Sequence, residues 1–228
     1  MSRIYNNFKF KIPEYKILAR MGYLRGMTIP VEVERKIKRV EKLGYLLSEP
    51  IGAVQDFEIV KNDGEVVELR IKSRCIGKES SFDVSGKNQK NKILNFEICS
   101  KDVAKMLKGC KQATLLVCTI GDKLTSYLDS YQQQGEIASA MMIDSFGSEA
   151  VEEVAEEITR NLARIAKKDG YELTFRFACG YGDWDLKDQK KILATINALE
   201  LNIHVGRGGI MEPRKSITGV IGWKKVSK

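Results

Sequence analysis

Residues 171–184 read YELTFRFACGYGDW, and this stretch marks a place where a strand gives way to a helix. Its first five residues alternate between apolar and polar side chains, which is typical of a half-buried strand. The two glycines that follow allow a positive φ or a close approach of the backbone to a ligand. Downstream, Asp185 can cap a helix that carries Ile192, Leu193 and Ile196 on its apolar side. The stretch therefore predicts a strand–turn–helix unit.

Arg176, at the end of the predicted strand, is the first candidate binding residue. Its planar guanidinium suits a carboxylate, because two parallel N–H groups can bond to the two oxygens. With two glycines and the aromatic Tyr181 and Trp184 nearby, the turn suits a small anionic or zwitterionic ligand. The same pattern also fits a tight turn with a surface arginine and a packing tryptophan. The residues of this stretch alone leave both interpretations open.

A second segment, MEPRKSITGVIG at residues 211–222, narrows the choice. Together the two segments resemble the activation (reactivation) domain of cobalamin-dependent methionine synthase, in its free-standing form. The matching residues are Arg176, Gly180, Tyr181, Gly182, Asp183 and Trp184 in the first segment, and Met211, Pro213, Ser216, Thr218 and Gly219 in the second. The resemblance covers most of the chain and is specific from about residue 135 onward.

The resemblance implies a binding site for S-adenosylmethionine. Arg176 matches the family arginine that holds the ligand carboxylate, and Glu149 matches a helical glutamate that receives the amino group. Tyr181 matches the tyrosine that lines the pocket. Ala178 and Gly180 match positions where the backbone approaches the adenosyl part.

Three further residues, Trp184, Ser216 and Thr218, are candidates for lining the same cleft. Ser216 and Thr218 are two positions apart, so they share one face of the predicted strand. Other interpretations stay open for several candidates. Glu149 stands in a glutamate-rich helix and also fits a solvated acidic face, Arg176 can pair with any nearby carboxylate, and Trp184 also fits a core.

The resemblance also implies a function, the reactivation of a cobalamin enzyme by reductive methylation of cob(II)alamin. S-adenosylmethionine would supply the methyl group, and no residue of the chain is implied as catalytic, because the cofactors carry the chemistry. A separate methionine synthase or related corrinoid protein would hold the cobalamin, and a flavodoxin-like or other reductant would supply the electron. A different class of function stays open, a non-catalytic module that docks a corrinoid protein without using S-adenosylmethionine.

Composition excludes several other classes of protein. The 228 residues include a single histidine, His204, and no Cys/His cluster with zinc spacing, which predicts no metal site and no histidine-dependent hydrolysis. Five cysteines without a C-x-x-C pair predict reduced thiols in a cytoplasmic protein. No run approaches the roughly 20 apolar residues of a membrane helix, and the N-terminus does not look like a secretory signal.

The formal charge of +8 is concentrated near both ends of the chain. Because the aromatic and basic platforms of RNA-binding modules are not evident, we expect no nucleic-acid partner. The charge is interpreted mainly as a solvated surface, and docking of an acidic partner protein stays open.

The order of predicted elements indicates an α+β fold, a mostly antiparallel twisted sheet with long helices packed on it and a small N-terminal helical portion. The turn signal Asn62-Asp63-Gly64 predicts a hairpin. Residues 78–92 predict an exposed loop, and strands near Glu172, Ile203 and Ile217 are expected to complete the sheet. The longest helix is predicted from Gly135 to Lys168. Its predicted apolar stripe is Ile137, Met141, Val151, Val154, Ile158, Leu162 and Ile165.

The expected domain organisation is an N-terminal helical subdomain over residues 1–50 and an α+β core over residues 51–228, or one continuous domain over residues 1–228.

Overall fold

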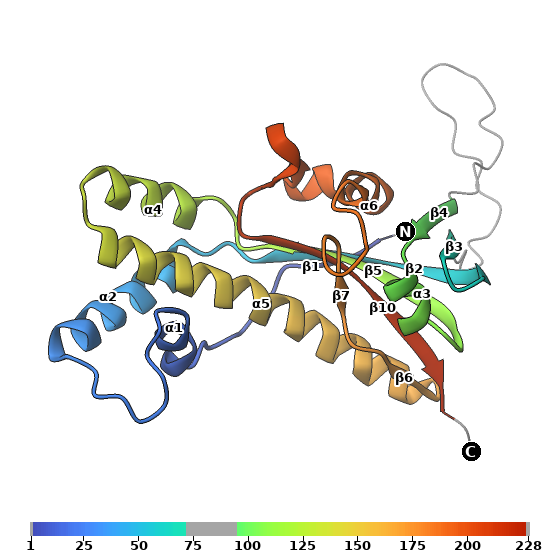
Figure 1. The fold of residues 1–228 in the computed structure, drawn as a ribbon, viewed down its shortest axis with the longest axis horizontal. Helices are drawn as coiled ribbons and strands as arrows, with labels where there is room; N and C mark the ends of the chain where they lie inside the picture. The colour runs from blue at the N-terminus through green and yellow to red at the C-terminus, as the bar shows by residue number, and fades with distance from the viewer. Residues whose placement is uncertain (1, 72–94, 227–228) are drawn as a thin grey trace.

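The computed structural model describes residues 2–71 and 95–226, so the predicted loop at residues 78–92 lies outside the described part. The fold is built on one sheet of eight strands (Figure 1). Its order is β4-β3-β2-β5-β10-β6, with β1 beside β2 and β7 beside β10, and every pairing is antiparallel. The strands are β1 (Arg3–Tyr5), β2 (Ile51–Asn62), β3 (Val66–Ile71), β4 (Asn95–Cys99), β5 (Cys110–Thr119), β6 (Tyr171–Leu173), β7 (Phe177–Ala178) and β10 (Ser216–Lys225). The predicted α+β class is confirmed.

Helices cover both faces of the sheet (Figure 1). They are α1 (Glu14–Arg20), α2 (Val31–Leu47), α3 (Lys101–Met106), α4 (Lys123–Gln133), α5 (Ile137–Lys168), α6 (Asp188–Ile196) and the short 3-10 helices η1 (Ala198–Leu201) and η2 (Arg207–Gly209). The long α5 runs along one face and shares its core with α1, α2 and α4. Helices α3, α6 and η1 pack on the other face.

The central strand β5 shows why two cores form. Its side chains alternate between the faces, so Leu116 and Cys118 pack towards α5 while Leu115 and Val117 pack towards α6. All four are fully buried, because both faces are covered. This burial on both faces explains why apolar residues run almost continuously through residues 113–120.

The first fifty residues pack against this same framework. Strand β1 pairs with β2, and Ile17 of α1 and Ile37 of α2 are buried in the core that α5 forms with the sheet. Within residues 2–71 and 95–226, none of the helices combines the length and the apolar character that crossing a membrane requires.

The structure corrects the N-terminal part of the apolar stripe that was predicted for the long helix. Val151, Val154, Ile158 and Leu162 are buried as expected, but Ile137 and Met141 are more than half exposed. The first turns of α5 instead bury Ala140, Met142, Ile143 and Phe146. The core at this end is formed with α2 and α4 rather than with the sheet alone, and this rotates the apolar stripe.

Two other predictions around the sheet need correction. The predicted strand at Ile203 lies outside the main sheet, because β8 (His204–Val205) pairs only with β9 (Met211–Glu212) in a separate two-stranded sheet. The helix after the Gly-Tyr-Gly turn begins at Asp188, and Asp185 does not cap it. Its Oδ1 atom accepts a bond from the backbone N–H of Lys187 at 2.9 Å, one turn before the helix.

Gly44 is the contact point between α2 and α5. A Cβ atom at this position would overlap the Phe146 ring, which is fully buried and held edge-on against Tyr45. We therefore expect Gly44→Ala to destabilise the protein by about 1–3 kcal/mol through overpacking. On helix propensity alone the same change would stabilise it by about 0.5–1 kcal/mol, so the sign of the effect tests the packing. Urea unfolding of this variant, with Lys42→Ala on the exposed side of α2 as the control, measures it.

Candidate functional site

The candidate site lies at the junction between β6 and β7. The expected continuous strand is broken here, because β6 pairs with residues 223–225 of β10 and β7 pairs with residues 219–220. Thr174 bridges the break, since its hydroxyl accepts a bond from the Gly222 N–H at 2.8 Å. Arg176 lies in this break, immediately before β7.

Gly219 on β10 makes room for the Arg176 side chain. A Cβ atom at Gly219 would lie 3.1 Å from Cγ of Arg176 and 2.8 Å from the carbonyl oxygen of Phe177. The missing side chain lets the arginine stem cross β10 towards α5. The glycine that the resemblance singled out thus positions Arg176.

Arg176 already holds carboxylates of α5. Its Nη2 atom donates to Oε2 of Glu152 at 2.6 Å and lies 3.7 Å from Oε1 of Glu156. The arginine side chain is only 11% exposed, whereas the two glutamates are 45% and 51% exposed. Its Nε atom is buried and has no hydrogen-bond partner among the residues that the structure describes.

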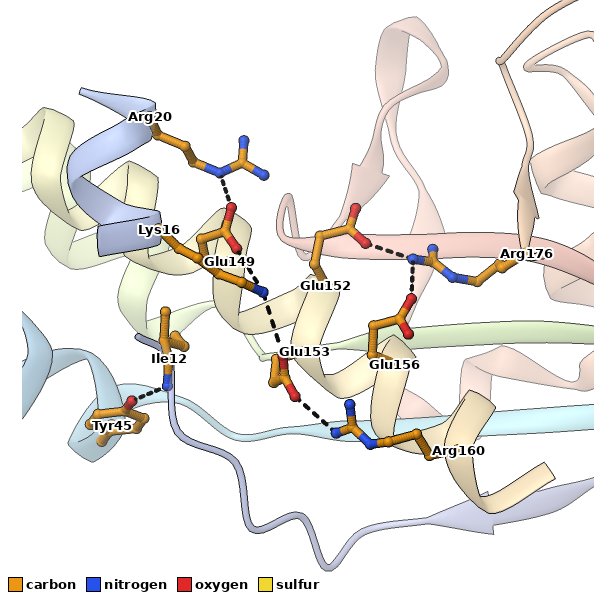
Figure 2. Close-up of polar contacts among 10 residues, drawn as sticks. All are labelled: Ile12, Lys16, Arg20, Tyr45, Glu149, Glu152, Glu153, Glu156, Arg160 and Arg176. Carbon is orange, nitrogen blue, oxygen red and sulfur yellow. Dashed lines mark hydrogen bonds and ion pairs between the residues drawn. The ribbon is translucent and has the colours of Figure 1, made fainter. Parts of the chain in front are cut away.

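Glu149 lies one helical turn before Glu152 on α5, and cations of α1 hold it (Figure 2). Nε of Arg20 donates to Oε1 of Glu149 at 2.5 Å, and Nζ of Lys16 lies 3.7 Å from Oε2. The Glu149 side chain is 13% exposed. Figure 2 shows that Arg176 and the α1 cations approach the same stretch of α5 from opposite sides. The structure therefore brings the two predicted anchors to neighbouring turns without pairing them with each other.

Five carboxylates of this part of α5 have ion-pair partners. They are Asp144, Glu149, Glu152, Glu153 and Glu156, and their cations are Lys16, Arg20, Arg160, Arg176 and Lys215.

The loop after β7 carries the other predicted ligand contacts. Ala178 pairs with Gly219 in the sheet, and Gly180 and Gly182 both have positive φ values, of 90° and 54°. Tyr181 stands at the tip of this turn and is 71% exposed. Gly180 and Tyr181 are therefore accessible on the loop that follows β7.

Asp183 fastens this loop to the start of α3. Its carboxylate accepts bonds from the hydroxyl of Ser100, from the backbone N–H of Lys101 at 2.7 Å and from that of Asp102 at 3.2 Å. These donors, with Ser100 first, lower the pKa of Asp183 below its usual value. Ser100 also caps α3, since its Oγ accepts a bond from the Val103 N–H at 3.0 Å.

This tie predicts a pH dependence. A carboxyl group with a depressed pKa in the folded state adds stability at pH values above its unfolded pKa, about 3.9, and loses it as the pH falls through the folded value. Asp183→Asn should therefore be less stable than the parent protein at pH 7, and the difference should shrink below about pH 4. Urea midpoints from pH 7 to pH 3 measure this. A difference that is constant with pH would show that the ionised carboxylate is not responsible.

The three candidate cleft-lining residues lie elsewhere than expected or face inward. Trp184 is 1% exposed and belongs to the core under α6, where its indole N–H donates to Oδ2 of Asp188 at 3.0 Å. Ser216 is half-buried and donates to the carbonyl oxygen of Pro213 at 2.6 Å. Thr218 is 2% exposed, and its hydroxyl has no partner among the described residues. Trp184 is thus a packing residue, as one of the two interpretations of the sequence had it.

Cys179 is also a structural residue. It is buried, and burial raises the pKa of its thiol to about 12, so the thiolate is scarce at neutral pH. His204, the single histidine, is half exposed and its Nε2 atom lies 3.1 Å from Oε2 of Glu212. Within the described ranges, no three His, Cys, Asp or Glu side chains are grouped so as to hold a metal ion.

Two cavities, of about 420 and 400 Å³, lie away from these residues. One is beside the hairpin turn and α3, and the other is between the N-terminal strand and the end of α6. None of the predicted site residues lines either cavity.

Sequence reasoning missed the partners that hold Glu149. Lys16 and Arg20 are more than a hundred positions away along the chain, so no local motif joins them to it. Their spacing of four residues on α1, which places both on one helical face, was the available signal. The resemblance includes Asp183 only as part of its first matching segment. The bonds by which Asp183 fastens the loop to α3 are seen only in the structure.

Comparisons with known proteins place the fold. A scan against protein-family models and a search of curated proteins both find no match. Among solved structures, the chain is similar to the crystal structure of the MetH reactivation domain bound to AdoHcy. The TM-score is 0.63, the match covers 100% of this chain and 80% of that one, and 12% of the aligned residues are identical. At this identity the similarity shows a shared fold.

Proposed function

We propose that this protein binds S-adenosylmethionine and supports the reductive reactivation of a cobalamin-dependent methionine synthase. The observation that carries the proposal is that Arg176 and Glu149 lie along the same stretch of α5 (Figure 2), because Arg176 pairs with Glu152, one helical turn from Glu149. The methionyl end of S-adenosylmethionine has one carboxylate and one ammonium group, and these two residues offer the matching charges. The fold shared with a reactivation domain that was crystallised with AdoHcy supports the same ligand class.

The residues present fit this ligand in their chemistry. The Arg176 side chain is only 11% exposed, and its guanidinium faces carboxylates of α5. A ligand carboxylate is proposed to bind this guanidinium. The ammonium group is proposed to bind Glu149. The exposed ring of Tyr181 and the backbone around Gly180 lie on the loop after β7, which Asp183 holds in place. These parts are proposed to cover the adenosyl group.

The proposed role of the chain is to orient the ligand. Reactivation joins one electron to the transfer of the sulfonium methyl group to cobalt, so the methyl group must face the metal in line. The cobalamin is proposed to belong to a separate methionine synthase or related corrinoid protein, and the electron to come from a flavodoxin-like or other reductant. We propose that this takes place in the cytoplasm, where the unpaired cysteines of the described part remain reduced.

The internal ion pairs favour a second candidate function. Because Arg176 and Glu149 both have partners within the chain, the protein can also be a non-catalytic module that docks a corrinoid protein without using the ligand. Ligand binding separates the two candidates.

Calorimetric titration of the chain with S-adenosylmethionine and with S-adenosylhomocysteine is the first test. The proposed function predicts saturable binding of both with one site per chain. Methyl transfer from labelled S-adenosylmethionine to a reduced corrinoid protein, in the presence of the chain, then tests reactivation. Absence of binding, together with retained docking on the corrinoid protein, would favour the second candidate.

A further inference from the structure

We infer that Glu152 and Arg20 compete with the ligand for Arg176 and Glu149, so that a ligand with both a carboxylate and an ammonium group must open two ion pairs to bind. This inference rests on the proposed function and adds the residues that limit the affinity of its site. Glu152 stands where a ligand carboxylate would be held, and Arg20 stands where a ligand ammonium would be held.

The burial of the four residues shows which member of each pair is fixed. Arg176 is 11% exposed, while its partner Glu152 is 45% exposed. Glu149 is 13% exposed, while its partner Arg20 is 43% exposed. In both pairs the residue that the site needs is held in place, and its competitor extends into solvent. A half-exposed partner can turn away into water at little cost, because exposed ion pairs contribute only about 0.2–1 kcal/mol.

The fixed residues have independent supports. The aliphatic part of the Arg176 side chain lies over Gly219, where a Cβ atom would come within 3.1 Å of Cγ of Arg176. The Nε atom of Arg176 is buried. Glu149 sits in the middle of α5, next to the fully buried Ala150. Arg20 is the last residue of the seven-residue helix α1, so its side chain can leave Glu149 without disturbing a strand or a long helix.

The exchange conserves charge. A zwitterion that places its carboxylate on Arg176 and its ammonium on Glu149 releases one glutamate and one arginine side chain to water. A ligand with only one of the two charges releases one competitor and leaves the other ion pair closed. For each anchor that a ligand uses, the apparent affinity is the intrinsic affinity multiplied by the fraction of molecules in which that anchor is free of its ion-pair partner.

The competing residues can be removed without removing the site. We expect Glu152→Gln to bind S-adenosylhomocysteine about threefold to tenfold more tightly than the parent chain, because the glutamine amide competes less well for the guanidinium. Arg20→Gln should tighten binding by a similar factor. Since Glu156 lies 3.7 Å from Nη2 of Arg176 and can replace Glu152, the double variant Glu152→Gln/Glu156→Gln is measured beside the single one.

The matched control is Arg160→Gln. Arg160 is 50% exposed and donates to Glu153 on the same helix at 2.8 Å, but it touches neither anchor. Its affinity should equal that of the parent chain. The competition is also tested with 5′-methylthioadenosine, which lacks both charged groups of the ligand. Its weaker binding should be unchanged in Glu152→Gln and in Arg20→Gln.

Calorimetry at low salt, with thermal unfolding to verify that each variant is folded, distinguishes the outcomes. If the parent chain binds S-adenosylhomocysteine as tightly as the Glu152 and Arg20 variants do, or more tightly, the competition is overturned while the proposed function stands. Tighter binding in Arg160→Gln as well would show a general charge effect and also overturns it. Absence of binding by the parent and by every variant overturns the proposed function and the competition together.

Discussion

Replacing Arg176 with alanine should weaken the binding of S-adenosylmethionine at least about 30-fold, which corresponds to about 2 kcal/mol. The ligand carboxylate would lose its only proposed cationic partner, whose side chain is only 11% exposed to water. The fold should survive, because Glu152 and Glu156, which the change leaves unpaired, are about half exposed and can be solvated. Calorimetry measures the loss of affinity.

Two further variants make this result specific. Arg160→Ala removes an ion pair from the same helix and should bind the ligand as the parent chain does. Arg176→Lys keeps the charge but loses the planar fork, so it should restore only part of the affinity. Full affinity in Arg176→Ala would contradict the proposed site, and full affinity in Arg176→Lys would show that a point charge suffices.

Replacing Trp184 with alanine should destabilise the protein by about 3–5 kcal/mol, the usual cost of removing a large aromatic side chain from a core. Trp184 is 1% exposed and packs with Phe177, and the loop that it anchors carries Gly180 and Tyr181. Its backbone carbonyl also accepts the Gly180 N–H at 3.0 Å, which closes the turn. The free energy of unfolding in urea is the measurement.

Trp184→Phe separates packing from hydrogen bonding. It keeps an aromatic ring but loses the indole N–H that reaches Asp188, so a loss of about 1–2 kcal/mol is expected. Asp188 would keep its ion pair with Lys191, at 2.7 Å. A loss below about 1 kcal/mol in Trp184→Ala would mean that the tryptophan is not a core residue and would reopen its role as a cleft-lining side chain.

Local patterns in the sequence predicted the elements whose structure depends on near neighbours. The turn signal Asn62-Asp63-Gly64 gave the hairpin of β2 and β3, because these residue types favour a tight turn whatever lies around them. The apolar stripe from Val151 to Leu162 gave the body of α5. Ser100 gave the start of α3 for the same reason, since a cap needs only residues within one turn.

The predictions fail where the local structure depends on contacts between segments that are distant in the sequence. Residues 171–175 alternate like one strand, yet the pairing with β10 breaks at Thr174, whose hydroxyl and backbone both bond to Gly222. The exposure of Ile137 and the separate pairing of His204 likewise depend on packing partners that are far away in the chain. A single sequence carries little information on such contacts.

The candidate site stays a prediction. The motif positions placed Glu149 on α5, and the structure shows Arg176, which precedes β7, in contact with Glu152 one turn further along that helix. The same motifs said nothing of Arg20 and Glu152 as their partners, because ion pairs between surface side chains leave no periodic signal. The sequence cannot decide whether Trp184 lies in the core or in the cleft, because a buried tryptophan and a ligand-stacking one have the same sequence signature.

A crystal structure of the chain grown with S-adenosylhomocysteine tests the central claim most directly. The account predicts that the ligand carboxylate lies within about 3 Å of the Arg176 guanidinium and its amino group within about 3 Å of the Glu149 carboxylate, with Glu152 and Arg20 turned to solvent. A ligand bound elsewhere, with the ion pairs Arg176–Glu152 and Arg20–Glu149 unchanged, would contradict it.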